Sequence, residues 1–346
     1  MNLDPINISK QGGFEASFKP TLELMSVEQI NQLIAAEKRS VDSLITQRLH
    51  SEVVLINQLG HYIINSGGKR LRPILLLLSA KAFGYKGFNH IQLAAVVEFI
   101  HTATLLHDDV VDASHLRRGK DTANAIWGNE ASVLVGDFLY SRAFQMMVEC
   151  GNMRVMEILS EATNVIAEGE VMQLLNCHEP DTPEESYLEV IRYKTAKLFE
   201  AATKLGPLLA NASEFDIESL GRYGMHLGTA FQLIDDVLDY NGNAEQIGKN
   251  VGDDLAEGKP TLPLIYTMRH GNPEQVALVR NAIEQGGKDN IDEIITAIKS
   301  TGALEYTEKA ARKEAEEAIN CIAHISESRY KRALISLAEF SVNRDH

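Results

Sequence analysis

The chain has 346 residues, of which 45% are hydrophobic and 23% charged, and this length and composition allow it to bury a large core. Its 33 basic and 48 acidic side chains leave a formal charge of −15, which argues against nucleic acid as a partner because a phosphate backbone needs a basic face. The three cysteines, Cys150, Cys177 and Cys321, are isolated and lack metal-ligand spacing, so we expect free thiols in a reducing compartment.

The N-terminal residues show neither a helical period nor the pattern of a secretory signal, in which a basic stretch precedes an apolar one. We therefore expect residues 1–25 to form a mobile arm and residues 26–346 to form one domain. The most apolar stretches, 74–78 and 91–106, are too short or too often interrupted by polar residues to span a bilayer, so we expect a cytoplasmic protein.

From residue 26 to the end of the chain, apolar residues recur with the period of a helix, and strand-like alternation is rare. Most glycines and prolines fall between these periodic segments, among them Gly206 and Pro207. No low-complexity linker or clear domain boundary interrupts the pattern. It therefore predicts one large all-α helical bundle.

A glycine-rich basic stretch, residues 66–73, opens the apolar helical segment 74–78. Pro73 suits the first turn of a helix, where free N–H groups favour an anion. Lys69 and Arg72, three residues apart, could then bind a diphosphate. The alternative interpretation is a basic turn that only solvates the start of a helix.

The next long apolar segment ends in three carboxylates, Asp108, Asp109 and Asp112. A helix turns about 100° per residue, so the first and the last of them lie about 40° apart on one face. Carboxylates this close repel one another and raise each other's pKa unless a cation lies between them. Because the cluster offers only oxygen ligands, it suits Mg²⁺ rather than zinc. The alternative is an acidic helix end that is merely solvated.

Basic residues flank this first acidic cluster. His101 lies two helical turns before Asp108 and about 20° from the same azimuth, which favours a substrate contact over an ordinary core histidine. Arg117 and Arg118 follow the cluster. Their guanidinium groups could bind phosphate in a bidentate manner, neutralise the neighbouring aspartates, or do both.

A second acidic cluster starts 127 residues after the first and repeats its spacing. Positions i, i+3, i+4 and i+7 of one helical stripe hold Gln232, Asp235, Asp236 and Asp239. Two such clusters that face each other across a bundle could hold several Mg²⁺ ions. The ligand that suits this arrangement is a diphosphate, whose charge the metals would neutralise as it leaves. This pair of clusters is the strongest functional signal in the chain.

Three further lysines are candidates for the same site. Lys249 and Lys259 lie in a loop-like stretch after the second cluster, where they could contact outer phosphate oxygens. Lys194 precedes Thr195 in a helix-like segment, residues 187–202, and this pair carries no information by itself.

Together these motifs resemble a known family. In chain order they are Gly-Gly-Lys-Arg-x-Arg-Pro, Asp-Asp-x-x-Asp, Arg-Arg-Gly, Lys-Thr and Phe-Gln-x-x-Asp-Asp-x-x-Asp. Over residues 26–340 the chain resembles the trans-prenyl diphosphate synthases, and most of all the bacterial octaprenyl diphosphate synthases that make the ubiquinone side chain. The resemblance implies the isoprenoid synthase fold with a central cavity, a homodimer and several Mg²⁺ ions, three of them with substrate bound. It also implies head-to-tail addition of isopentenyl diphosphate to an allylic diphosphate such as farnesyl diphosphate.

The same resemblance implies roles for individual residues. The Mg²⁺ ligands, direct or through water, would be Asp108, Asp112, Asp235, Asp236 and Asp239, and these would be catalytic together with Asp109, which supports the first cluster, and Lys194. Isopentenyl diphosphate would be bound by Lys69, Arg72, His101 and Arg118. The allylic diphosphate would be bound by Arg117, Lys194, Thr195, Gln232, Lys249 and Lys259. The chain departs from shorter-chain members at Glu170 and Gln173, where they commonly carry Gln and Asp, so a contact of either residue with metal-bound water stays open.

Product length should depend on the residues that close the tunnel below the first cluster. Helical side chains lean towards the N-terminus, so residues just before Asp108 would line the way down. On an ideal helix Thr104 lies beneath Asp108, and Ala103 lies about 140° away. The resemblance nevertheless singles out Ala103, at the fifth position before the cluster, which is bulky in short-chain enzymes. Both side chains are small, so either argument predicts an open tunnel and a long product, which would leave through at most transient membrane contact.

Three other interpretations compete with this one. A class I terpene cyclase shares the fold and the first cluster, but usually carries an Asn/Ser/Glu-type second metal motif instead of Asp-Asp-Val-Leu-Asp. A non-catalytic subunit of a heteromeric prenyl synthase typically lacks motif residues that this chain keeps. A calcium-binding helical protein would need an Asp-x-Asp-x-Asp-Gly loop, which the sequence does not contain.

Overall fold

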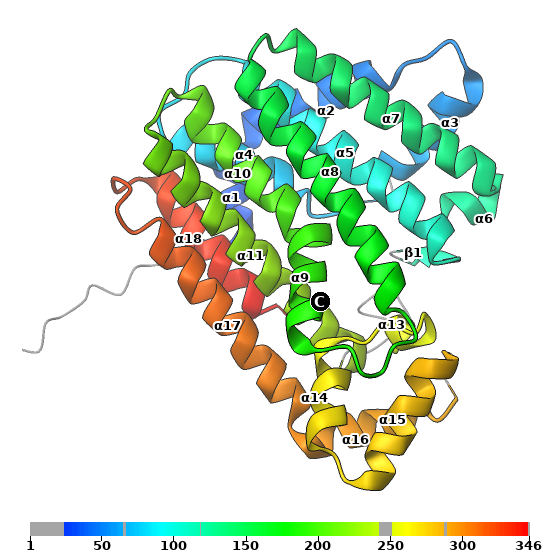
Figure 1. Ribbon diagram of the computed structural model, residues 1–346. Helices are drawn as coiled ribbons and strands as arrows, with labels where there is room; N and C mark the ends of the chain where they lie inside the picture. Colours follow the sequence, from blue (N-terminus) through cyan, green and yellow to red (C-terminus); the bar gives the residue numbers. More distant parts are fainter. Residues whose placement is uncertain (1–23, 65–66, 118, 242–250, 287–288, 345–346) are drawn as a thin grey trace, which may run out of the picture.

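The computed structural model describes residues 24–64, 67–117, 119–241, 251–286 and 289–344. Within these ranges the chain forms a helical bundle (Figure 1), which confirms the predicted all-α class. Its elements are α1 (Val27–Leu33), α2 (Ala35–Leu49), α3 (Val54–Ile64), α4 (Leu71–Ala82), α5 (Asn89–Val111), β1 (Leu116–Arg117), β2 (Lys120–Asp121), α6 (Ala123–Trp127), α7 (Asn129–Glu149), α8 (Met153–Asn176), α9 (Glu184–Ile191), the π-helix η1 (Arg192–Ala196), α10 (Lys197–Leu209), α11 (Glu214–Asn241), α13 (Asp253–Ala256), α14 (Leu262–His270), α15 (Pro273–Gln285), α16 (Ile291–Thr301), α17 (Ala303–Cys321) and α18 (Arg329–Val342). Among the described residues, no helix combines the length and the apolar composition that crossing a membrane requires.

Helices α4 and α5 lie inside the bundle because they are apolar around most of their circumference. In α4 every residue from Pro73 to Ala80 is buried. In α5 the buried positions extend from His90 to Asp109. Helices of this kind must be covered on several sides, and α10 packs against α4, α5, α8 and α11. Helix α11 in turn packs against α17 and α18, so that the ends of α5 and α11 are held in one rigid framework (Figure 1).

The structure contradicts one prediction about chain breaks, because Gly206 and Pro207 lie inside α10 rather than between helices. A Cβ atom on Gly206 would lie 2.5 Å from the backbone N of Ala80, so a glycine here lets α10 approach α4 closely. Pro207 occupies the last turns of the helix, where its missing N–H removes one backbone hydrogen bond. Both residues are buried, so tertiary packing outweighs their local preference for a break.

A second apolar cluster lies at the C-terminal end of α11, at the bottom of Figure 1. It joins Val237 and Tyr240 of α11 to buried side chains of α13, α14, α15 and α16. Val237 and Tyr240 alternate along α11 with the residues of the second acidic cluster. The cluster therefore holds α13 and the segment that follows it against the part of α11 that carries the carboxylates.

The first described helix begins where the helical pattern predicted it. Ser26 caps α1 by accepting a hydrogen bond from the backbone N of Gln29, whose side chain returns the bond. The backbone N of Met25 donates to Oγ of Ser336 at 2.9 Å and so ties the start of the bundle to α18. The expected arm lies almost entirely outside the described residues, so the division into an arm and one domain stays an expectation.

Candidate active site

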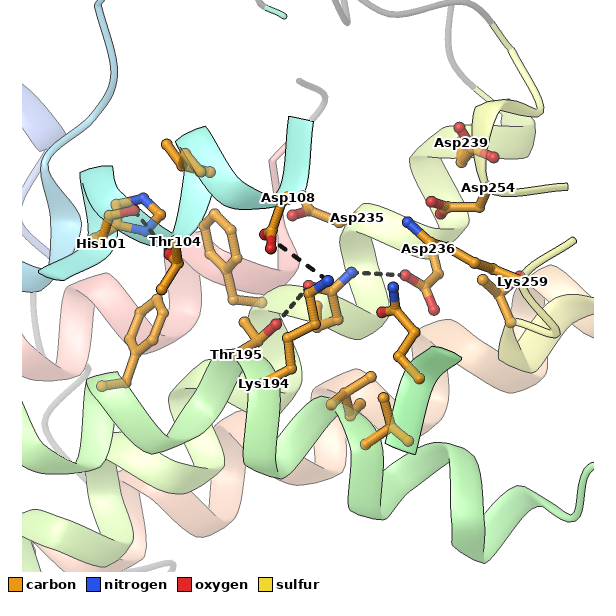
Figure 2. A pocket seen from close by; sticks show the side chains of 18 of the residues that line it. His101, Thr104, Asp108, Lys194, Thr195, Asp235, Asp236, Asp239, Asp254 and Lys259 are labelled. Atoms are coloured by element: carbon orange, nitrogen blue, oxygen red, sulfur yellow. Dashed lines mark hydrogen bonds and ion pairs between the residues drawn. The ribbon is translucent and has the colours of Figure 1, made fainter. Parts of the chain in front are cut away.

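A cavity of about 670 Å³ brings the two acidic clusters together. The end of α5 and the facing part of α11 contribute its carboxylates, and η1 and the segment after α13 contribute lysines (Figure 2). Of the residues singled out in the sequence, the cavity is lined by Lys69, Arg72, His101, Thr104, Asp108, Asp112, Arg117, Glu170, Gln173, Lys194, Thr195, Gln232, Asp235, Asp236, Asp239 and Lys259. Asp109 and Ala103 are fully buried instead. Arg118 and Lys249 lie outside the described residues.

Two of the three aspartates of the first cluster face the cavity, and the third is buried away from it. Asp108 and Asp112 line the cavity, whereas Asp109 is fully buried. Arg117 holds Asp109 in place, with its Nε 2.8 Å and its Nη2 2.7 Å from Oδ1. Burial raises the pKa of Asp109, and the positive charge of Arg117 partly offsets this effect. Arg117 thus anchors the turn after α5, while its contact with an allylic diphosphate stays a prediction.

In the second cluster, Asp236 is almost fully buried and is held by hydrogen bonds from two helices. Oη of Tyr187 on α9 donates to Oδ2 at 2.5 Å, and Nε2 of Gln232 on α11 donates to Oδ1 at 2.9 Å. Oγ1 of Thr195 donates to Oε1 of Gln232 at 3.1 Å and so fixes the orientation of the amide (Figure 2). Burial, together with the charge of nearby Asp254, raises the pKa of Asp236 to about 8. A cation in the cavity would favour the charged form of this carboxyl group.

Asp235 is more exposed than Asp236 and pairs with Arg344, the last described residue of the chain. The guanidinium group lies over the ring of Phe231, with Cζ 3.7 Å from the ring centroid, and Nη2 donates to the backbone O of Phe231 at 2.6 Å. Phe231 and Asp235 are one helical turn apart on α11. Arg344 therefore covers this face of α11 at the edge of the cavity.

Lys194 and Thr195 lie in η1, which interrupts the helix predicted over residues 187–202. Short π-helical segments of this kind often occur at functional sites. The segment packs on α8 at Gly169, where a Cβ atom would lie 2.6 Å from the backbone N of Lys194. Because α8 approaches so closely, Nζ of Lys194 donates to Oε2 of Glu170 at 2.6 Å.

Lys259 reaches the first cluster from the segment after α13. Its Nζ donates to Oδ2 of Asp112 at 2.9 Å and also pairs with Glu257. Burial alone would lower the pKa of Lys259, but the charges of Asp112, Asp254 and Glu257 raise this pKa above its ordinary value. The ammonium group is therefore positively charged although little of it reaches solvent.

Basic residues from the turn before α4, from the first turn of α4 and from α5 line another part of the cavity. Nη1 of Arg72 lies 3.2 Å from Nε2 of His101, and its guanidinium group lies over the ring of Phe199, 4.4 Å from the centroid. Burial lowers the pKa of Lys69, and the positive charge of Arg344 adds to this effect. An anion bound here would offset these positive charges.

The two candidates for control of product length occupy different environments. Thr104 lines the cavity below Asp108, and its Oγ1 donates to the backbone O of His101 at 2.8 Å. Ala103 is fully buried in the core and does not line the cavity. The helical-wheel argument thus gave the right direction for Thr104. The effect of either residue on product length stays a prediction.

The oxygen donors of the cavity fit Mg²⁺. Burial, together with the charge of Asp108, raises the pKa of Glu170 to about 7, and a divalent cation would oppose this effect. Within the described ranges, no group of three His, Cys, Asp or Glu side chains is arranged to hold a metal ion by itself. Mg²⁺ usually takes only one or two carboxylates and completes its shell with water and substrate phosphate oxygens. The two clusters therefore fit metal ions whose coordination a diphosphate would complete.

Comparison with known proteins places the chain in a family. The family model for polyprenyl synthetases matches residues 53–300. The chain belongs to the polyprenyl synthetase family. This synthase is 54% identical to the octaprenyl diphosphate synthase of Escherichia coli strain K12, over 93% of this chain and 100% of the relative. An all-trans-nonaprenyl-diphosphate synthase (geranyl-diphosphate specific) from Rhodobacter capsulatus is 46% identical, over 90% of this chain and 96% of the relative.

Solved structures agree with this assignment. A polyprenyl synthase from Caulobacter crescentus CB15, complexed with calcium and isoprenyl diphosphate, has a TM-score of 0.90 and 44% identity, over 93% of this chain and 98% of that one. The predicted isoprenoid synthase fold and the predicted prenyltransferase activity are confirmed. The synthase is a long-chain trans-prenyltransferase, and polyprenyl synthases use a divalent metal.

Several residues of the cavity wall escaped the sequence analysis. They are Tyr187, Phe199, Phe231, Asp254 and Arg344. Phe231 belongs to the Phe-Gln-x-x-Asp-Asp-x-x-Asp motif and could have been found by its place beside Gln232. The others lie in no motif, and their contacts join segments that are distant in the sequence, so no sequence signal pointed to them.

Proposed function

We propose that the synthase makes octaprenyl diphosphate by adding isopentenyl diphosphate units head-to-tail to an allylic diphosphate, with farnesyl diphosphate as primer. The observation that carries the proposal is one cavity in which two acidic clusters and a set of basic side chains meet. The product length is supported by 54% and 52% identity to the octaprenyl diphosphate synthases of Escherichia coli and Haemophilus influenzae. A homodimer, a cytoplasmic location, transient membrane contact during product release and use of the product for the ubiquinone side chain belong to the same proposal.

The allylic diphosphate would lie between the two clusters. The residues proposed to bind its oxygens are Arg117, Lys194, Thr195, Gln232, Lys249 and Lys259. Lys194 and Lys259 support this role because each places an ammonium group beside an aspartate of the first cluster. Fixed positive charges there would stabilise the negative charge that develops on the diphosphate as its C–O bond breaks.

The residues proposed to hold Mg²⁺ are Asp108, Asp112, Asp235, Asp236 and Asp239, with three ions when substrate is bound. Bound there, Mg²⁺ would neutralise charge on the leaving diphosphate. Tyr187 and Gln232 keep Asp236 oriented through their hydrogen bonds. Asp109 supports the first cluster from behind, because its ion pair with Arg117 anchors the turn in which α5 ends.

Isopentenyl diphosphate would bind at the basic part of the cavity. The residues proposed for this role are Lys69, Arg72, His101 and Arg118. The double bond of this substrate would attack the allylic cation, and loss of a proton from the new unit would form a trans double bond. Leu105, Val190 and Ile191 line the cavity and would keep water away from the cation.

Incorporation of radiolabelled isopentenyl diphosphate by the purified protein tests this function. With farnesyl diphosphate and Mg²⁺ we expect a product that, after removal of its diphosphate, co-migrates with octaprenol in reversed-phase chromatography. Chelation of the metal should abolish incorporation. A protein that incorporates label only after a second subunit is added would be a non-catalytic partner, and a cyclic hydrocarbon formed from the allylic diphosphate alone would indicate a terpene cyclase.

A further inference from the structure

Lys194 is shared between an aspartate of the first cluster and a carboxylate outside it. Its Nζ lies 2.6 Å from Oε2 of Glu170 and 3.8 Å from Oδ2 of Asp108. The hydrogen bond is therefore made to Glu170. The contact with Asp108, which Figure 2 shows as a dashed line, is the longer one. The side chains of Lys194 and Asp108 are only 17% and 16% exposed, so water screens these charges weakly.

Lys259 is likewise shared between an aspartate of the first cluster and an additional glutamate, but unlike Lys194 it donates a hydrogen bond directly to the aspartate. Its Nζ contacts Oδ2 of Asp112 at 2.9 Å and also pairs with Glu257. The side chains of Lys259 and Asp112 are both 15% exposed. Lys194 comes from η1 and Lys259 from the segment after α13, so two unrelated elements supply the same combination of a lysine, a cluster aspartate and an additional glutamate.

A lysine that binds a metal-ligating carboxylate competes with Mg²⁺ for the same oxygens. The attraction between unlike charges is strong where water is excluded, so a buried ammonium group takes the nearest carboxylate that is available. Without the charge of Glu170, the ammonium group of Lys194 would move towards Asp108, which is already 3.8 Å away. A metal ion would then have to displace it.

We propose that Glu170 and Glu257 are positioning residues that compete with the metal-binding oxygens of the first cluster for the ammonium groups of Lys194 and Lys259. Glu170 holds Lys194 back from Asp108, and Glu257 draws Lys259 partly away from Asp112. Each glutamate acts through its lysine and not on the metal. The inference rests on the proposed function, because it takes Asp108 and Asp112 as ligands of the metal. Each lysine meanwhile stays beside the cavity, within reach of a diphosphate.

A double-mutant cycle for metal affinity tests this proposal. Mn²⁺ is the probe: the electron paramagnetic resonance signal of free Mn²⁺ is measured as full-length protein is added, at a fixed concentration of farnesyl thiodiphosphate, an allylic analogue that ionises too slowly to react. Glu170→Gln should weaken Mn²⁺ binding about tenfold, which corresponds to one charge-assisted hydrogen bond. In a Lys194→Met background the same substitution should change the affinity less than twofold, because no lysine is left to move.

The outcomes separate this role from a direct one. An equal loss of affinity in both backgrounds would show that Glu170 acts on the metal itself and would overturn the proposal, as would no loss in either. Glu168→Gln is the matched control, because it removes the same charge from an exposed position on α8. A similar loss in this control would assign the effect to net charge and would also overturn the proposal.

The second lysine provides an independent cycle. Glu257→Gln should weaken Mn²⁺ binding in the wild-type background and change it less than twofold in a Lys259→Met background. This second cycle still tests the proposal if a variant at position 170 or 194 fails to fold. A wild-type protein that binds no Mn²⁺ with the analogue present would overturn the proposed function, and this inference with it.

Discussion

One methyl group added at Gly169 should disturb both the stability and the activity of the synthase. A Cβ atom there would lie 2.6 Å from the backbone N of Lys194 and 2.8 Å from Cβ of Tyr193. Backbone atoms cannot turn aside as the end of a long side chain can, so α8 and η1 would have to separate. Overpacking costs about 1–3 kcal/mol, whereas replacing a helical glycine by alanine gains at most about 1 kcal/mol. With an overpacking cost in the middle of its range, about 2 kcal/mol, and a gain of at most about 1 kcal/mol, we expect Gly169→Ala to lower the free energy of unfolding by about 1–2 kcal/mol.

The same separation would move Glu170 away from Lys194, so kcat/KM should fall more than about tenfold. Urea unfolding followed by circular dichroism measures the free energy of unfolding, and incorporation of labelled isopentenyl diphosphate measures kcat/KM. Gly60→Ala is the matched control, because Gly60 also lies in a helix and its nearest obstacle is the end of the Leu49 side chain at 3.2 Å. This control should keep full activity. A Gly169→Ala protein as stable and as active as the wild type would refute the argument from close packing.

Three further predictions test the site. Asp236→Asn should lower kcat about 100- to 1000-fold in steady-state assays, because a carboxylate that holds the metal ion beside the leaving diphosphate is lost; a change below tenfold would contradict its role. In the metal-free protein the pKa of Glu170 is raised to about 7 and that of Asp236 to about 8, so Mg²⁺ binding near pH 7 should release protons and become tighter as the pH rises. Calorimetry in buffers of different ionisation enthalpy measures this release, and its absence would be evidence against the metal site. Thr104→Phe should shorten the product more than Ala103→Tyr, because only Thr104 lines the cavity; chromatographic sizing of the products would show the reverse order if this reasoning were wrong.

The sequence predicted the helical class well and the interruptions of its helices poorly. Apolar periodicity predicted a helix over residues 187–202, and the chain is helical there, but η1 interrupts it. A π-helical segment changes neither composition nor periodicity strongly, and here it is stabilised by the close approach of α8 at Gly169. At Gly206 and Pro207 the error was the opposite: a break was predicted and the helix continues. Their burial inside α10 outweighs the local preference of both residues for a break.

The candidate site was predictable where its geometry is local. The spacing of Asp108 and Asp112 places both on one face of a helix, and both line the cavity. The partners of these carboxylates were not predictable, because they come from distant parts of the chain. Lys259 contacts Asp112 across 147 residues of sequence, and Arg344 contacts Asp235 across 109. Such contacts depend on the packing of the whole bundle, which no local motif records.

The most direct test of the central claim is to locate the metal by anomalous diffraction. Crystals of the synthase would be grown with Mn²⁺ and farnesyl thiodiphosphate, and data collected at the manganese absorption edge. We expect anomalous peaks within coordination distance of Asp108 and Asp112 and of the carboxylates of the second cluster, with diphosphate oxygens between them. Peaks confined to other parts of the molecule, or a diphosphate bound without metal between the clusters, would contradict the claim that the two clusters act together.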